Sequence, residues 1–103
     1  MYKISFFVPL IYADQVKSAV FLTGAGRIGA YDRCCWETAG TGQFRPLSGS
    51  DPFIGGEGGL ETVEELKVEM VCSFENIDAA IVALKKAHPY ETPAYEVIKV
   101  ETF

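Results

Sequence analysis

The stretch VEELKVEMVCSFENIDAAIVALKKAHPYETPAYEVIKVE, residues 63–101, decides the fold because three element patterns follow one another in it. Apolar and charged residues alternate along residues 63–74, as in a strand that buries one face and exposes the other. The apolar positions are Leu66, Val68, Met70, Cys72 and Phe74. This alternation is the clearest in the chain, and it predicts a strand over these residues.

A helix is predicted next, from Asn76 to about His88. Asparagine is favoured at the N-terminal cap of a helix, and apolar residues recur at helical spacing after it. This apolar stripe consists of Ile77, Ile81, Leu84 and His88. Pro89 ends the helix because proline cannot continue the backbone hydrogen bonds. Residues 94–101, AYEVIKVE, then predict the last strand.

The N-terminal half of the chain contains a similar succession of patterns. Residues 2–8 alternate and predict a strand, and residues 13–23 predict a helix. Residues 31–38 and 43–47 predict two extended pieces separated by a turn at AGTG. The order β-α-β-β-α-β is the split βαβ pattern of a ferredoxin-like α+β fold, with two helices on one face of a four-stranded, mostly antiparallel sheet.

The sheet face away from the helices has no cover within the chain. The strand patterns place on it Phe7, Tyr31, Cys35, Val71, Tyr95 and Val97, mixed with Glu69 and Lys99. An aromatic-rich sheet face of this kind is typical of a subunit interface. We therefore expect a homo-oligomer.

The composition indicates one small acidic domain over residues 1–103, with a formal net charge of −5. Lysines and arginines are scattered, which argues against nucleic acid and anionic membranes as partners. No apolar run reaches the ~18 residues of a membrane span. The segment MYKISFFVPL favours a strand over a signal peptide, so we expect a cytoplasmic protein. The three cysteines are expected to be reduced thiols.

The segment GAGRIG, residues 24–29, has the glycine spacing of a dinucleotide-binding turn. It follows a helix and leads into a strand, which is the reverse of the order that pyrophosphate binding requires. We therefore interpret it as a turn with positive φ angles. From this turn Arg27 could still hold an anion or the carboxylate of a neighbouring subunit.

The second glycine-rich segment, residues 48–60, contains no Gly-Lys-Ser/Thr and is not a P-loop. Long glycine-rich loops in compact domains are often functional or disordered. Asp51 and Glu57 could meet a cation or remain solvated. Arg45, just before the loop, could pair with a carboxylate across a subunit boundary.

The segment AHPYETPAYE, residues 87–96, contains the only histidine and lies at the same end of the predicted sheet as the loop at 48–60. His88 and Glu91 could bind one divalent metal ion, or Glu91 could orient the imidazole. Since zinc sites use three or four protein ligands, a metal here would be shared between subunits or bound weakly. The alternative is a structural turn or an interface. Tyr90, in the same turn, is a candidate ligand contact.

Four ordered motifs, GAGRIGAYDRCCW, GTGQFRPLSGSDPFIG, VEELKVEM and AHPYETPAYEV, resemble the YqfO-type insert domain of the Nif-three-like family, which has a dinuclear metal centre. The resemblance covers essentially the whole chain. It implies a fold like those of PII signalling proteins and CutA, and a trimer with clefts between subunits. In PII proteins such clefts hold nucleotides, and in CutA they are linked to divalent cations. The family's metal is held by two flanking lobes, which we expect to be absent here.

These observations predict a non-enzymatic, trimeric binding or regulatory module that takes a divalent cation or a small ligand at subunit clefts. The candidate ligand-binding residues are Arg27, Arg45 and Tyr90, and the candidate metal ligands are His88 and Glu91. No catalytic residue is predicted, because no serine lies beside a histidine base and the cysteines read as strand interior. The alternatives are a metal-dependent hydrolase and a structural module that docks on a partner protein.

Overall fold

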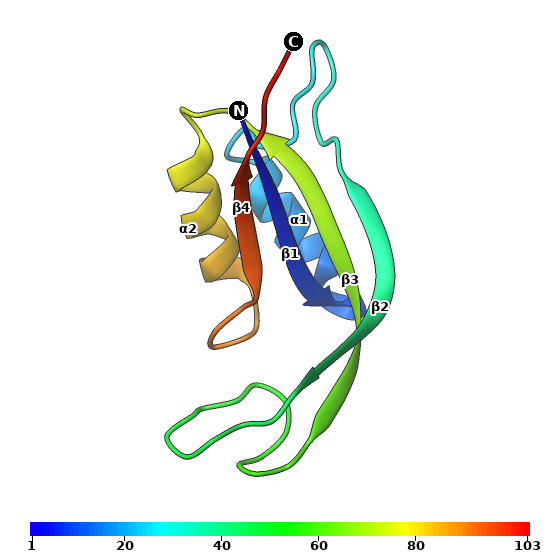
Figure 1. The fold of residues 1–103 in the computed structure, drawn as a ribbon, viewed down its shortest axis with the longest axis vertical. Coiled ribbons are helices and arrows are strands. Elements are labelled where there is room, and N and C mark those ends of the chain that lie inside the picture. Colours follow the sequence, from blue (N-terminus) through cyan, green and yellow to red (C-terminus); the bar gives the residue numbers. More distant parts are fainter.

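A computed structural model describes residues 1–103 as a four-stranded sheet with two α-helices and one 3-10 helix, η1. The elements are β1 (Tyr2–Pro9), η1 (Leu10–Tyr12), α1 (Ala13–Phe21), β2 (Trp36–Phe44), β3 (Glu61–Cys72), α2 (Ile77–Ala87) and β4 (Tyr95–Lys99). The strand order is β2-β3-β1-β4, and every neighbouring pair is antiparallel (Figure 1). The predicted ferredoxin-like α+β fold is confirmed.

The core lies between the sheet and the two helices. It contains alternate residues of β1 and β3, because successive side chains of a strand point to opposite faces. The strand contribution is Ile4, Phe6, Val8, Val68, Met70 and Cys72, and the helices add Ala13, Val16, Val20, Ala80 and Leu84. Ala25, just after α1, completes the cluster. Neither α-helix has the length and apolar character that a bilayer crossing requires.

The structure corrects the prediction for residues 31–47. The AGTG sequence, predicted as a turn, lies inside the continuous strand β2. Gly40 pairs with Glu65 and Gly42 pairs with Val63, so the ladder to β3 holds both glycines extended despite their low strand propensity. Residues 31–35 precede the strand and are irregular instead: Tyr31 forms an isolated bridge with Ile28, and Arg33 has a φ of 55°.

The open face of the sheet also differs from its prediction. Tyr95 pairs with Phe6 and Val97 with Ile4, so both lie on the helix side, as does Lys99. A one-residue change of register exchanges the two faces of a strand. Both faces of β4 carry apolar as well as charged residues, so its sequence does not indicate which face is buried. Tyr31 and Cys35 lie outside the strands. The open face carries Lys3, Ser5, Phe7, Trp36, Thr38, Phe44, Glu65, Lys67, Glu69, Val71, Glu96 and Ile98.

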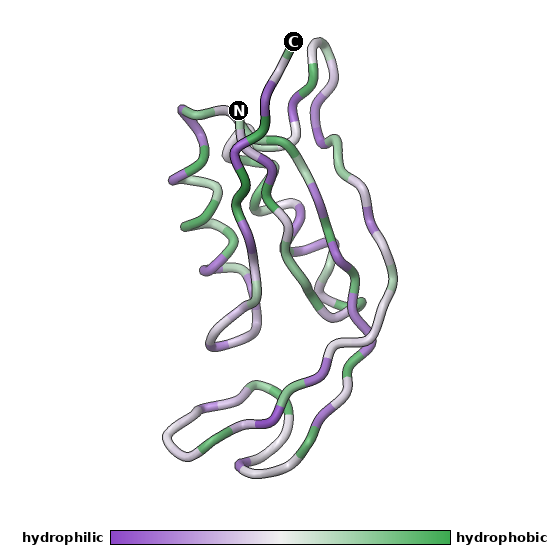
Figure 2. Tube along the Cα trace, in the orientation of Figure 1, coloured by the Kyte–Doolittle hydropathy of each residue, from purple (hydrophilic) through white to green (hydrophobic).

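The far part of the β2–β3 hairpin leaves the rest of the molecule and curves to one side (Figure 1). We call residues 40–64 the arm, and the remainder of the chain the body. The arm makes the molecule elongated, with extents of 46 × 24 × 23 Å. Pro46 is its one buried residue, and hydrophobic and polar segments alternate along it (Figure 2).

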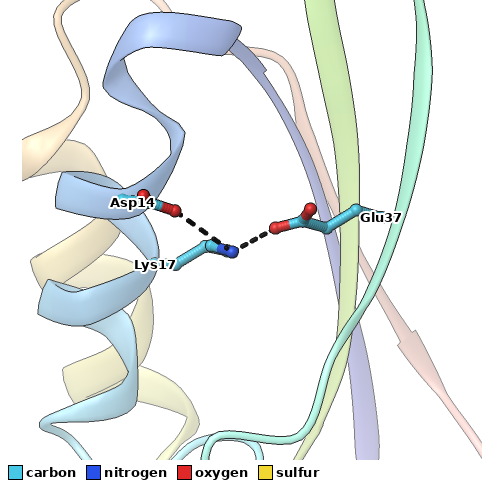
Figure 3. A network of polar contacts seen from close by, with 3 residues as sticks. All are labelled: Asp14, Lys17 and Glu37. Atoms are coloured by element: carbon cyan, nitrogen blue, oxygen red, sulfur yellow. Dashed lines mark hydrogen bonds and ion pairs between the residues drawn. The ribbon is translucent and has the colours of Figure 1, made fainter.

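The near half of β2 is tied to the body by a charged contact from α1. The Lys17 ammonium bridges Glu37 of β2 and Asp14 of its own helix, with 3.5 Å to the Asp14 carboxylate (Figure 3). The hydrogen bond to Glu37 raises the pKa of Lys17, so this lysine stays charged. The contact orients the strand before it enters the arm.

Candidate functional site

A cavity of about 860 Å³ lies on the open face of the sheet, at the end where β1 finishes. Three segments form its walls: the arm strands, the glycine-rich loop and the turn after α2. Its aromatic lining consists of Phe7, Phe44, Phe53 and Tyr90. Its ionisable lining consists of Arg45, Glu65, Lys67 and Glu91. The predicted meeting of the glycine-rich loop with the AHPYETP turn is thus confirmed.

His88 fixes the turn after α2 to the sheet. Pro89 disfavours helix at the residue before it, and His88 is extended, with φ −67° and ψ 135°. Its imidazole is only 5% exposed. The ring Nε2 lies 2.7 Å from the carbonyl oxygen of Phe7, and Nδ1 accepts the backbone N–H of Tyr90 at 3.1 Å. Because Nδ1 accepts, the proton of the neutral ring is on Nε2, which donates to Phe7.

Burial holds the pKa of His88 below its usual value, so this ring is neutral. The hydrogen bond to Phe7 and the charge of Glu65 oppose the shift without reversing it. With both ring nitrogens bonded to the main chain, the imidazole has no free lone pair. His88 in this state acts as a brace that sets the position of Tyr90.

Tyr90 connects the turn to the β3 strand of the sheet. Its hydroxyl donates to Glu65 Oε2 at 2.9 Å. Its ring packs against Phe44, with 5.9 Å between centroids, and against His88, with 4.9 Å. Burial raises the pKa of Tyr90, and the hydrogen bond to Glu65 raises it further. The tyrosine therefore remains a neutral donor at physiological pH.

Glu65 is the buried acidic group of the cavity, whereas Glu91 is exposed, and the sequence analysis did not single Glu65 out. It is only 9% exposed. Its Oε1 has no hydrogen-bond partner, yet every fully buried side-chain oxygen in the structure has one, so Oε1 is accessible. A Cβ atom on Gly42 would lie 1.9 Å from this oxygen, and the glycine therefore leaves the space that the carboxylate occupies.

The other predicted site residues are not all at this end. Glu91 Oε2 accepts the backbone N–H of Asp51 at 3.0 Å, which joins the turn to the glycine-rich loop. Arg45, directly after β2, is exposed and lines the cavity. Arg27 is exposed at the opposite end of the sheet, where Gly24 and Gly26 adopt the predicted positive φ angles of 98° and 81°. The structure thus brings together four of the five candidates.

The donor atoms for a metal ion are sparse throughout the chain. No three side chains of histidine, cysteine, aspartate or glutamate lie close enough together to hold one. His88 and Glu91 belong to one turn, but a metal at His88 would have to displace a main-chain hydrogen bond. Cys72 is buried in the core, and burial raises the pKa of its thiol.

No family model matches the chain. A protein named GTP cyclohydrolase 1 type 2 homolog from Halalkalibacterium halodurans is 45% identical over 97 residues, which cover 94% of this chain and 26% of that protein. A Bacillus cereus protein related to NIF3 has a TM-score of 0.83 at 37% identity, over 98% of this chain and 26% of the other. The periplasmic divalent cation tolerance protein CutA from Archaeoglobus fulgidus has a TM-score of 0.68 at 19% identity, over 100% of this chain and 87% of the CutA chain.

These similarities confirm the resemblance to the YqfO-type segment of the Nif-three-like family. The chain spans about a quarter of the length of the curated relatives that it matches, at 26% of each of the first two. The likeness to CutA, at 19% identity, is a likeness of fold.

Proposed function

We propose that this chain, a homologue of the YqfO-type segment of NIF3-related proteins, is a self-associating module that binds a small ligand in the cavity at the base of the arm. The observation that carries this proposal is the construction of the cavity. Phe7, Phe44, Glu65 and Tyr90 come from four separate segments, and hydrogen bonds and ring contacts hold the last three together. Ligand pockets combine apolar walls with a few placed polar groups in this way.

Binding is favoured over catalysis by the state of the histidine. A general base needs a free nitrogen within reach of its substrate. Both nitrogens of His88 are bonded to Phe7 and Tyr90, and its ring is behind the cavity wall. We therefore propose a regulatory or carrier role for the ligand rather than its chemical conversion.

Self-association is supported by the exposed edges of the sheet. β2 is an edge strand with no buried residue, and its outer backbone groups are free to pair with another chain. Trp36 is 70% exposed on the open face. We propose a trimer, in line with the PII/CutA resemblance, in which Arg27 or Arg45 reaches a neighbouring subunit. Size-exclusion chromatography with light scattering tests this, and a monomer at micromolar concentration contradicts it.

A divalent cation is a second candidate ligand, because His88 and Glu91 share one turn. Such an ion would coordinate the two side chains only after the imidazole had released a main-chain partner. The word cyclohydrolase in the names of the relatives refers to proteins about four times as long as this chain, which matches 26% of the first of them. Metal analysis of purified protein, with assays of phosphatase and cyclohydrolase activity, tests the hydrolase alternative.

The ligand proposal is tested by NMR with a library of small polar and aromatic compounds. We expect compounds that bind to change the chemical shifts of the protein's backbone amides chiefly at Gly42, Phe44 and Tyr90. Phe44→Ala should weaken these binders, whereas Phe74→Ala, which removes a ring that is 71% exposed outside the cavity, should not. Shifts that are scattered over the surface, or equal losses in both variants, contradict the proposal.

A further inference from the structure

We infer that the cavity takes a small organic cation: an ammonium group on an apolar body, with Glu65 as its counter-ion. This inference rests on the proposed ligand-binding function and specifies its ligand class. It follows from the uncompensated charge of Glu65, from the aromatic rings of the cavity and from the small number of side chains that could bind a metal ion.

The charge argument begins with the partners of each lining group. Glu91 accepts the N–H of Asp51 through Oε2. The Lys67 ammonium is directed to Glu69, at 3.8 Å. Glu65 takes part in no ion pair, and its one hydrogen bond comes from the neutral Tyr90 hydroxyl. A largely buried carboxylate with a single neutral donor is poorly compensated, and a cation next to its accessible Oε1 would complete it.

The aromatic argument concerns the rings around that carboxylate. Cations are attracted to the face of an aromatic ring within about 6 Å of its centroid. Tyr90 is held beside Glu65 by its hydroxyl, and Phe44 packs on Tyr90 at an interplanar angle of 58°. Phe7 lines the same cavity from β1, on the same sheet face as Glu65. A cavity lined by one carboxylate and these three rings matches an ammonium group with an apolar substituent.

Other ligand classes fit these groups less well. Zinc takes three or four protein ligands, and Ca²⁺ and Mg²⁺ take six or more oxygen ligands, whereas no group of three metal-binding side chains exists here. An anion in the inner part of the cavity would face the unpaired carboxylate of Glu65. Arg45, the one lining cation without an ion pair, is an exposed residue on the arm. An acidic group on the same ligand could extend toward it.

The test uses three probes of the same size that differ in charge: benzylammonium, benzyl alcohol and benzoate. Their dissociation constants are measured by NMR titration of the full chain, followed at the amides of Gly42, Phe44 and Tyr90. We expect benzylammonium to bind about tenfold more tightly than either of the other two. Glu65→Gln should abolish this preference, because the amide keeps an acceptor for Tyr90 and loses the charge. Glu64→Gln is the matched control, since Glu64 is an exposed residue on the other face of β3, and it should change nothing.

A second variant keeps the test decisive if Glu65→Gln folds poorly. Phe44→Leu preserves apolar volume but removes a ring, so it should weaken benzylammonium severalfold more than benzyl alcohol. Equal binding of all three probes in the cavity overturns the cation inference and leaves the proposed function standing. Failure of all three to perturb the cavity amides contradicts both.

Discussion

The body and the arm of this molecule are stabilised in different ways. All twelve residues of the hydrophobic core belong to the body, and none belongs to residues 40–64. The arm has one buried residue and is positioned by the ladder between β2 and β3, the contact of Phe44 with Tyr90, and the bond between Asp51 and Glu91. The cavity lies where these two regions meet, so its shape depends on a few polar and aromatic contacts rather than on the core. Changes that alter binding should therefore be separable from changes that unfold the protein.

The largest expected effect comes from truncating the core. Leu84→Ala removes a fully buried side chain and should lower the free energy of unfolding by about 3 kcal/mol. Leu47→Ala, in the arm, removes a side chain that is 63% exposed and should cost less than about 0.5 kcal/mol. Urea denaturation followed by circular dichroism measures both. Similar losses for the two variants would contradict the division into body and arm.

Removing the histidine brace should have the next largest effect. His88→Ala leaves the carbonyl of Phe7 and the N–H of Tyr90 without partners and should cost about 2 kcal/mol. If His88 acts only as a structural brace, His88→Ala should lower thermal stability by the same amount in the presence of a chelator and of added Zn²⁺ or Mg²⁺. If it is a metal ligand, wild-type protein gains thermal stability from the cation and the variant does not. Thermal unfolding of both proteins in each condition distinguishes the two roles.

The pH dependence of stability should report the same residue with a smaller amplitude. The folded-state pKa of His88 is depressed below 6.5 by burial, so the unfolded chain binds the proton more readily. The free energy of unfolding should therefore fall as the pH drops below 6.5, until the folded-state pKa is passed. His88→Ala should lack this component when the two denaturation series are subtracted. A difference that is flat between pH 7 and 5 would show that the imidazole is not buried in its neutral form.

Loss of the contact between the turn and Glu65, the first body residue after the arm, should have a small, local effect. Tyr90→Phe removes the hydrogen bond to Glu65 and should cost about 1 kcal/mol. Hydrogen exchange should accelerate in residues 40–64 and in the turn, while the amides of α2 and β1 keep their rates. Uniform acceleration over the whole chain would mean that the arm and the body unfold together.

The body could largely be predicted from the sequence because its signals are local. Strict alternation from Leu66 to Cys72 assigned the buried face of β3, and Asn76 and Pro89 bounded α2 within a residue. Asn76 nevertheless makes no side-chain capping bond. The strand predicted over residues 94–101 is the shorter β4, Tyr95–Lys99, and its predicted open face is the helix side. Only its pairing with β1 decides which alternate residues are buried.

The arm and the site were harder to predict because their contacts are long-range. Glycines in AGTG indicate a turn locally, and only the ladder to β3 makes them part of a strand. The strand directions were enough to bring Tyr90 and Glu91 close to the glycine-rich loop. Glu65 was not predicted as a site residue because its place in the cavity depends on the hairpin register and on a hydrogen bond from a tyrosine 25 residues away. No local pattern distinguishes it from the solvated glutamates of the same strand.

The most direct test compares two glycines of the arm. A methyl group at Gly42 would collide with the Glu65 carboxylate, whereas one at Gly56, which does not line the cavity, would meet no atom within 4 Å. The carboxylate ends a flexible side chain, so Gly42→Ala should displace it without unfolding the body. Affinity for benzylammonium should fall about tenfold in Gly42→Ala and stay near the wild-type value in Gly56→Ala. Equal affinities in the two variants would contradict the assignment of this cavity as the binding site.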